Sequence, residues 1–218
     1  MTKVAIMGYG VVGSGLIELI DKNRENNGKN EIIITSILVR DKEKHISSSH
    51  SEVITTNVEE FFSIENDVVI EVMGGLHPAY DYVKKALDNA CHVMCESPIS
   101  LKKEQTKKLY DYAKKKGIVL FEALKTAYMK AFNRLVVLVK GGIIGDIKAI
   151  DATCTSMQPS NKWFYNKENA GGSFTDWGPF VLLPVLKIFG LDYKKCSFVT
   201  DIDEKKGIDI FTQISLLY

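Results

Sequence analysis

Six residues near the N-terminus constrain the fold of this chain more than any other stretch. They read Gly8-Tyr9-Gly10-Val11-Val12-Gly13 and match the pattern G-x-G-x-x-G. An apolar strand is expected directly before them at residues 4–7, and helical periodicity follows at residues 11–23. A strand, a glycine-rich turn and a helix in this order are typical of a dinucleotide-binding turn. The alternative is a glycine-rich turn that binds nothing.

Each glycine of the motif has an expected role. Gly8 permits the tight turn, Gly10 lets the backbone approach a pyrophosphate, and Gly13 lets the helix pack closely on the strand. The helix N-terminus supplies unpaired N–H groups and positive potential to the phosphates. All six residues of the motif, with Tyr9, Val11 and Val12 between the glycines, are therefore candidate cofactor-binding residues.

Two charged residues after the next strand, at residues 32–39, bear on the choice of cofactor. An acid at this position accepts a hydrogen bond from a ribose 2′-hydroxyl and favours NAD, whereas an arginine accommodates a 2′-phosphate and favours NADP. Arg40 comes first and Asp41 follows it. Arg40 is better placed to stack on adenine and reach a phosphate, so NADP is favoured over NAD. A solvated Arg40 at the strand end is the competing interpretation.

Strand and helix patterns alternate through the first half of the chain. Further strands are expected at residues 68–73, 92–96 and 118–123, with helices at residues 79–89 and 100–116. This alternation predicts an α/β, doubly wound parallel sheet of the Rossmann type, covered on both faces, over residues 1–123.

The pattern changes in the second half, residues 124–218. We expect helices at 127–140 and 174–189, a strand at 146–157 and a polar, aromatic loop at 158–171. Strands at 194–203 and 208–218 should pair antiparallel, because the turn between them is too short for a crossover. The prediction is an α+β substrate and dimerisation domain with an open, largely antiparallel sheet, which is incomplete because the last strand leaves an unpaired edge.

Composition narrows the class of partner. Lys+Arg 28 against Asp+Glu 27 leaves a net charge of +1, which gives no electrostatic case for nucleic acid or an anionic membrane. The N-terminus has no signal-peptide pattern, and the longest apolar run, at 181–186, contains Pro184 and is too short to span a bilayer. The four cysteines are expected to be reduced thiols of a cytoplasmic protein.

The stretch CHVMCESPIS, residues 91–100, has metal-ligand side chains but no usual metal-site spacing. Strand alternation sends Cys91 and Cys95 to one face and His92 to the other. We therefore expect core thiols and no metal. Ser97 lacks the turn and the base of a nucleophilic serine.

Two sets of segments resemble known families. DVVIEVMGGLHPAYDYVKKALDNACHV at 67–93, which includes Met73-Gly74-Gly75, and SILVRD at 36–41 resemble the nucleotide-binding domain of homoserine dehydrogenases. From about residue 94, the segments CESPIS, LFEALKTAYMKAFNRL, VKGGIIGDIKAIDAT and GGSFTDWGPF resemble the Gfo/Idh/MocA oxidoreductases, most of all their dihydrodiol-dehydrogenase branch. The second family's chains are longer, so the resemblance predicts a chain that stops within its second domain.

The resemblance implies hydride transfer between a nicotinamide and a hydroxyl or carbonyl of a sugar, polyol or related small molecule. It also implies a homodimer through the open sheet, and cofactor contacts from the 73–75 loop and from Glu96-Ser97-Pro98. The family's strand-end motif is Glu-Lys-Pro, so Ser97 replaces a lysine that positions substrate and relays the proton. Phe180 replaces the usual His or Tyr after the aspartate of the GGxxxD motif, which remains as Asp176.

Alcohol chemistry needs a proton donor or acceptor, which Ser97 and Phe180 cannot supply. Lys125 follows the strand at 118–123 and is the expected proton-handling residue, with Asp176 positioning the substrate. The competing interpretation of Lys125 is an exposed strand-end charge. The remaining candidates, which are expected to line the substrate side, are Tyr128, Lys162, Trp163 and Phe180.

Three functions stay open at this stage. The first is an NAD(P)-dependent oxidoreductase. The second is a catalytically impaired nucleotide-binding pseudoenzyme, which the changes at Ser97 and Phe180 favour. The third is a homoserine-dehydrogenase-like enzyme, although the second-domain motifs resemble the other family.

Overall fold

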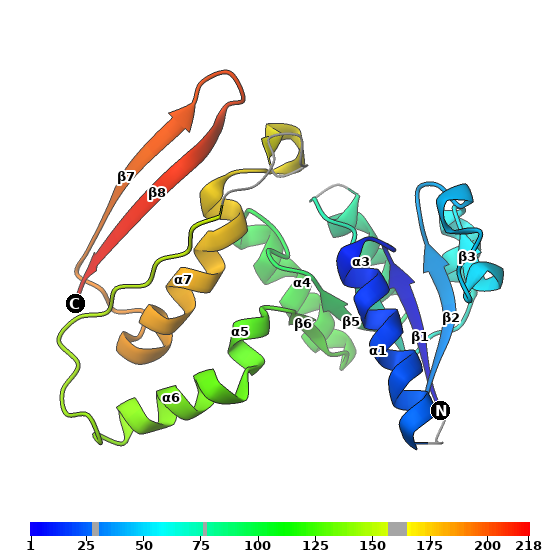
Figure 1. Cartoon of the computed structure of the whole chain (residues 1–218), viewed down its shortest axis with the longest axis horizontal. Coiled ribbons are helices and arrows are strands. Elements are labelled where there is room, and N and C mark those ends of the chain that lie inside the picture. Colours follow the sequence, from blue (N-terminus) through cyan, green and yellow to red (C-terminus); the bar gives the residue numbers. More distant parts are fainter. Residues whose placement is uncertain (28–30, 76–77, 157–164) are drawn as a thin grey trace. The chain divides into compact units, whose positions relative to one another are not determined.

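The structure is a computed structural model that describes residues 1–27, 31–75, 78–156 and 165–218. The chain divides into two compact units, Met1–Ala123 and Leu124–Tyr218, which are coloured from blue to green and from green to red in Figure 1.

The N-terminal unit contains one parallel sheet. Its strands are β1 (Thr2–Met7), β2 (Ile32–Leu38), β3 (Ile54–Thr55), β4 (Val68–Glu71), β5 (His92–Cys95) and β6 (Leu120–Glu122). They lie in the order β3-β2-β1-β4-β5-β6, and every neighbouring pair is parallel. This is the strand order of dinucleotide-binding folds, with the topological switch point between β1 and β4. The predicted Rossmann sheet is confirmed.

Helices cover both faces of this sheet. They are α1 (Val11–Asn27), α2 (Val58–Ser63), α3 (Ala79–Asp88) and α4 (Lys103–Lys116). Side-chain alternation along β1 divides the core. Val4 and Ile6 lie in one apolar cluster with Ile17 of α1, whereas Ala5 and Met7 lie in a second cluster to which α2, α3 and α4 contribute. Burial on both faces explains why the strands are predominantly apolar.

Residues 41–66 contain short elements that no sequence pattern predicts. The segment contains the 3-10 turns Glu43–His45 and Ser51–Val53, the two-residue strand β3 and the short helix α2. Asn57 caps α2, since its side chain accepts hydrogen bonds from the N–H groups of Glu59 and Glu60. These elements are too short to show a periodicity of their own.

The C-terminal unit contains helices and one hairpin. Its elements are α5 (Lys125–Tyr128), α6 (Lys130–Lys140), a 3-10 turn (Lys167–Asn169), α7 (Ser173–Phe189), β7 (Lys195–Asp203) and β8 (Ile208–Leu217). The two strands pair antiparallel, as predicted, and form the long hairpin that ends at the C-terminus in Figure 1. The predicted helix at 127–140 is interrupted at Met129, whose backbone is extended.

The strand predicted at 146–157 is wrong over residues 146–156, which have no regular structure, and residue 157 lies outside the described residues. Alternating β-branched residues such as Ile150 and Thr153 favour extended backbone, but a strand also needs a neighbour to complete its hydrogen bonds. In the described C-terminal unit, β7 and β8 pair only with each other. No helix within the described ranges has the length and apolarity needed to cross a bilayer.

Candidate functional site

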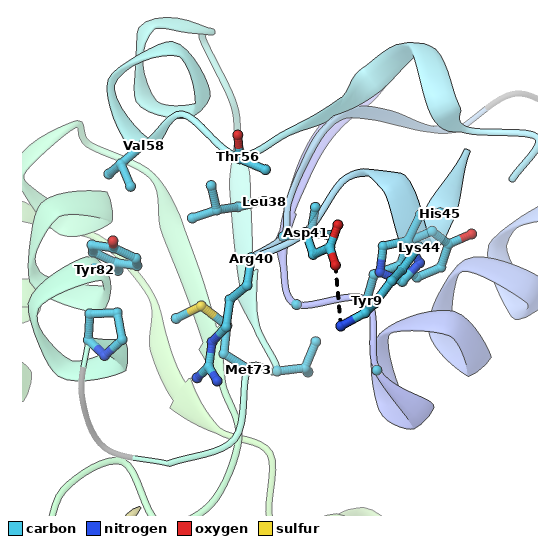
Figure 2. A pocket seen from close by; sticks show the side chains of 15 residues that line it. Tyr9, Leu38, Arg40, Asp41, Lys44, His45, Thr56, Val58, Met73 and Tyr82 are labelled. Carbon is cyan, nitrogen blue, oxygen red and sulfur yellow. Dashed lines mark ion pairs between the residues drawn. The ribbon is translucent and has the colours of Figure 1, made fainter. Parts of the chain in front are cut away.

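A cavity of about 410 Å³ lies in the N-terminal unit, at the carboxyl ends of its strands (Figure 2). The loops after β1, β2, β3 and β4 and the start of α3 form its wall. The lining residues are Gly8, Tyr9, Gly10, Leu38, Val39, Arg40, Asp41, Lys44, His45, Thr56, Val58, Val72, Met73, Pro78 and Tyr82. Open α/β sheets bind their ligands in this position, beside the switch point.

The glycines of the first turn differ in what surrounds them. Gly8 has a φ of +108°, and a Cβ there would lie 2.7 Å from the carbonyl oxygen of Val72. A Cβ on Gly13 would lie 2.2 Å from the carbonyl oxygen of Gly8. A Cβ on Gly10 would meet no atom of the protein within 4 Å. The fold therefore requires glycine at 8 and 13, while the open space at Gly10 fits the close approach of a ligand's phosphates.

Helix α1 begins directly after Gly10, and its first residues face solvent. Val11 and Val12 are 90% and 52% exposed. The N–H groups of a helix's first turn have no partner within the helix, and the helix dipole makes this end positive. A pyrophosphate would be held here by backbone N–H groups, so the residues present fit a dinucleotide.

Charged residues gather beyond the end of β2. The Asp41 carboxylate lies 3.3 Å from Lys44 Nζ, and the hydrogen bond from Lys44 lowers the pKa of Asp41. Arg40 is exposed, and in Figure 2 its side chain points away from the Asp41–Lys44 pair. Asp41 and Lys44 thus form an exposed ion pair beside Arg40.

Tyr9 joins the glycine turn to the loop after β2. Its ring stacks on His45, with centroids 4.7 Å apart and planes inclined by 23°. Its hydroxyl is hydrogen-bonded to Ser48 Oγ at 2.6 Å. These two contacts hold the 3-10 turn that carries Lys44 against the phosphate-binding turn.

The loop after β4 is held by a buried acid. Glu71 Oε1 accepts from the Met73 N–H at 2.7 Å, and Glu71 Oε2 accepts from Cys95 Sγ at 3.1 Å. Burial raises the pKa of Glu71. Met73 lines the cavity, and Gly74 and Gly75 follow it with positive φ values but are not among the lining residues.

The strand end after β5 has its own hydrogen bonds. Ser97 Oγ donates to Glu122 Oε1 at 2.8 Å, and the Ile99 N–H donates to the same oxygen at 3.2 Å. Glu96, Ser97 and Pro98 do not line the cavity.

Two cysteines, one directly before β5 and one at its end, lie in the core. Cys91 and Cys95 belong to one buried cluster together with Val93, as the strand alternation predicts. His92 is exposed, and its Nδ1 accepts from the Val119 N–H at 3.0 Å. Within the described ranges, no group of three or more His, Cys, Asp or Glu is placed to hold a metal ion.

The predicted substrate-side residues lie in the C-terminal unit. Lys125 is the exposed first residue of α5, and its Nζ is 5.9 Å from the centroid of the Phe180 ring on α7. Tyr128 is exposed. Asp176, in the first turn of α7, is half-buried, and this burial raises its pKa. Lys162 and Trp163 lie outside the described residues.

A carboxylate from β8 caps the helix that carries Asp176. Asp209 Oδ2 accepts from the Phe174 N–H at 2.7 Å and from Thr212 Oγ1 at 2.7 Å. A Cβ on Gly172 would lie 2.3 Å from Asp209 Oδ1. The glycine therefore makes room for the cap, which ties the start of α7 to the hairpin.

Sequence reasoning found part of the cavity and missed part of it. It named Gly8, Tyr9, Gly10, Arg40, Asp41 and Met73, and the structure brings these together. It missed Lys44 and His45, which a search for basic residues just after Arg40 would have found. Thr56, Val58, Pro78 and Tyr82 come from separate elements and carry no such signal.

Residues 8–122 match the family described as "Homoserine dehydrogenase, NAD binding domain". The chain belongs to this family. The match begins at Gly8 and ends in β6, so the matched part of this chain contains every residue that lines the cavity.

The similarity to two named dehydrogenases extends beyond the N-terminal unit into the C-terminal unit. The chain is 24% identical over 188 residues to trans-1,2-dihydrobenzene-1,2-diol dehydrogenase of Xenopus laevis, covering 85% of this chain and 57% of that protein. It is 26% identical over 200 residues to scyllo-inositol 2-dehydrogenase (NADP(+)) IolW of Bacillus subtilis, covering 87% of this chain and 52% of that protein. The chain thus spans about half the length of these relatives.

A solved structure supports the fold of the whole chain. An NAD-binding protein from Listeria innocua superposes with a TM-score of 0.74 at 19% identity, covering 99% of this chain and 63% of that one. Both resemblances inferred from the sequence are confirmed: a homoserine-dehydrogenase NAD-binding domain, followed by a region shared with dihydrodiol dehydrogenase and related oxidoreductases.

Proposed function

We propose that this protein is an NADP-dependent oxidoreductase that transfers a hydride between the nicotinamide and a hydroxyl or carbonyl of a sugar, polyol or related small molecule. The observation that carries the proposal is the open space at Gly10, at the start of α1 and inside a cavity that Arg40 also lines. The names of the relatives support the substrate class, since they include a diol dehydrogenase and an inositol dehydrogenase.

The charges around the cavity favour NADP over NAD. Asp41 is paired with Lys44, so it is less available to a ribose 2′-hydroxyl. Arg40, Lys44 and His45 all line the cavity and supply positive charge or N–H donors for a 2′-phosphate. A relative whose printed name includes NADP(+) is in line with this choice.

Proton handling is assigned to the C-terminal unit. When bound, the nicotinamide supplies the hydride donor or acceptor. Lys125 exchanges the proton of the substrate oxygen through its Nζ, and Asp176 positions the substrate by hydrogen bonding. Phe180 and Tyr128 supply apolar surface, and Lys162 and Trp163 complete the substrate side.

We also propose that the protein forms a homodimer and lies in the cytoplasm. A homodimer would form through the β7–β8 sheet, whose strands carry exposed apolar side chains such as Phe198 and Phe211. Free, buried Cys91 and Cys95 suit a reducing compartment, so we propose a cytoplasmic location.

Titration with NADPH and NADH, followed by turnover assays, tests the function. The protein should bind NADPH and then consume it with at least one member of a panel of keto sugars, aldehydes and diketones, or form it from NADP⁺ with polyols. Tight NADPH binding without turnover on any member would contradict the oxidoreductase. That result would favour a nucleotide-binding module without redox activity, in line with the replacements at Ser97 and Phe180.

A further inference from the structure

Tyr9 lies between the first two glycines of the phosphate-binding turn, and its side chain contacts the loop after β2. The ring stacks on His45 with centroids 4.7 Å apart, and the hydroxyl is hydrogen-bonded to Ser48 Oγ at 2.6 Å. Figure 2 shows the two rings next to Lys44. Tyr9 therefore makes one face contact and one polar contact with a single segment, residues 43–53, which is called the 43–53 loop.

The 43–53 loop is also tied to helix α1. Ser48 Oγ accepts a hydrogen bond from the His50 N–H at 3.1 Å, so the hydroxyl that meets Tyr9 also holds the turn toward His50. His50 Nε2 lies 2.9 Å from Asp21 Oδ2 on α1, and both side chains are partly buried. The series Tyr9–Ser48–His50–Asp21 thus connects the loop to the glycine turn and to the helix that follows it.

The loop itself provides little apolar burial. Neither of its 3-10 turns, Glu43–His45 and Ser51–Val53, contains a buried residue. Its backbone hydrogen bonds are local, such as those from the N–H groups of His45 and Ser48 to carbonyls three residues earlier. These local bonds keep the shape of the loop, whereas the contacts with Tyr9 and Asp21 fix its position against the glycine turn and α1.

The position of the loop decides where two cavity residues lie. Lys44 and His45 both belong to the first 3-10 turn, and both line the cavity together with Arg40. A side chain or loop that becomes ordered only on binding costs part of the binding free energy, and a group held in place beforehand avoids that cost. A 2′-phosphate gains from this order. NADH has a hydroxyl in place of that phosphate and gains much less.

We propose that Tyr9 is a positioning residue for cofactor selectivity. By holding the 43–53 loop, it presents Lys44 and His45 to the 2′-phosphate of NADP and so couples the pyrophosphate-binding turn to the choice between NADP and NAD. His50 and Asp21 hold the far side of the loop in the same role. This inference rests on the proposed NADP-dependent function, and it assigns a selectivity role to an uncharged side chain of the glycine motif.

Fluorescence titration of the full chain with NADPH and NADH tests the inference. Tyr9→Leu removes both the ring stack and the hydroxyl. It should weaken NADPH binding by about 5- to 20-fold, the range expected for one aromatic pair and one hydrogen bond, and leave the Kd of NADH within about twofold. The unchanged NADH affinity is the readout that general damage to the turn would not give. Tyr9→Phe keeps the stack and should lose about 2- to 5-fold for NADPH.

A ligand without a nicotinamide separates cofactor selectivity from redox chemistry. Adenosine 2′,5′-bisphosphate carries the 2′-phosphate and can be titrated by calorimetry. Its affinity should fall in Tyr9→Leu and Tyr9→Phe by the same factors as that of NADPH. Adenosine 5′-monophosphate, which lacks the 2′-phosphate, should bind the wild type and both variants equally.

Ser48→Ala separates positioning from a direct contact between Tyr9 and the cofactor. It removes the partner of the Tyr9 hydroxyl and of the His50 N–H, so it should weaken NADPH binding at least as much as Tyr9→Phe. The double variant should bind NADPH like Ser48→Ala alone, because both changes remove the same hydrogen bond. Tyr112→Phe is the matched control. The Tyr112 hydroxyl donates to Asp88, and its loss should change neither dissociation constant.

The outcomes distinguish this inference from the proposed function. A wild type that does not bind NADPH, or binds it no more tightly than NADH, removes the proposed NADP preference and this inference with it. A wild type that prefers NADPH, while Tyr9→Leu loses affinity for both cofactors equally or for neither, overturns this inference alone. So does a loss in Tyr9→Phe that Ser48→Ala does not reproduce, because the hydroxyl would then contact the cofactor directly.

Discussion

The two units of this chain differ in how far they bury their own apolar side chains. In the N-terminal unit, apolar side chains are fully buried on both faces of the sheet, Ile6 and Ile37 on one and Phe61 and Val83 on the other. Among the described residues of the C-terminal unit, Val139 and Ile208 are the buried apolar side chains, whereas Phe198 is 59% exposed. A six-stranded sheet between helices can close a core, and a two-stranded hairpin is marginal without further partners.

The two units therefore contribute differently to the stability of the chain and to ligand binding. The N-terminal unit contains the glycine turn, the cavity and most of the core, so it can hold a cofactor on a rigid base. The C-terminal unit carries Lys125 and Asp176, and its hairpin carries exposed apolar side chains such as Phe198 and Phe211. We expect cofactor binding to survive changes that disturb the hairpin.

The largest expected effect is on stability. Phe61→Ala should lower the free energy of unfolding by about 3–5 kcal/mol, because it removes a fully buried ring from the core. Phe198→Ala should change it by less than about 1 kcal/mol, since the ring is already largely in water. Urea unfolding followed by circular dichroism measures both. Equal losses of unfolding free energy in the two variants would contradict the difference in burial between the units.

Gly10 and Gly13 separate cofactor binding from folding within the N-terminal unit. Gly13→Ala should destabilise the unit by about 1–3 kcal/mol, because its Cβ would overlap the carbonyl oxygen of Gly8. Gly10→Ala should have the same free energy of unfolding as the wild type. It should nevertheless bind NADPH at least tenfold more weakly, because the methyl group occupies the space open to the phosphates. Urea unfolding and NADPH fluorescence titration check the pair, and unchanged NADPH affinity in Gly10→Ala would refute the assignment.

A change at Arg40 sharpens the account of cofactor choice. Arg40→Ala should weaken NADPH binding by about 10- to 100-fold, the equivalent of one or two charge-assisted hydrogen bonds, and should change NADH binding little. Lys140→Ala, at the exposed end of α6 in the other unit, is the control. Equal losses for the two cofactors would indicate that Arg40 does not contact the 2′-phosphate.

The smallest expected effect concerns the buried acid under the 73–75 loop. Burial raises the pKa of Glu71 above its ordinary value of 4.5 in the folded state. Between 4.5 and this raised pKa the folded state binds more protons than the unfolded state, so the contribution of Glu71 to stability falls as the pH rises through this window. Glu71→Gln should therefore gain stability relative to wild type between pH 4 and pH 8. Urea unfolding at several pH values in this range measures the free energy of unfolding of both proteins. A difference between them that does not change with pH would contradict a raised pKa of Glu71.

The parallel sheet was predictable, because β1, β4 and β5 are short, mainly apolar runs that are each followed by turn residues and a helix. Residues 4–7 with Gly8, Gly10 and Gly13 predicted the strand, turn and helix at the start of the sheet from local pattern alone. The two-residue strand β3 was missed, since two residues show no alternation. The strand predicted at 146–157 was wrong over residues 146–156, because pairing depends on a neighbouring strand that local sequence does not reveal.

The candidate site was also predictable only in part. Arg40 and Asp41 follow a strand directly, so their position at the cavity could be inferred. The Asp41–Lys44 pair depends on the 3-10 turn, and the Ser97–Glu122 hydrogen bond depends on the register of β5 against β6. Both contacts alter the chemistry inferred from the sequence, and neither follows from residue spacing.

The most direct test of the central claim is the ratio of the NADPH and NADH dissociation constants of the wild-type chain, measured by fluorescence titration at one salt concentration. A cavity with Arg40, Lys44 and His45 beside an engaged Asp41 predicts that NADPH binds at least about tenfold more tightly. Tighter binding of NADH, or no binding of either cofactor, would contradict it.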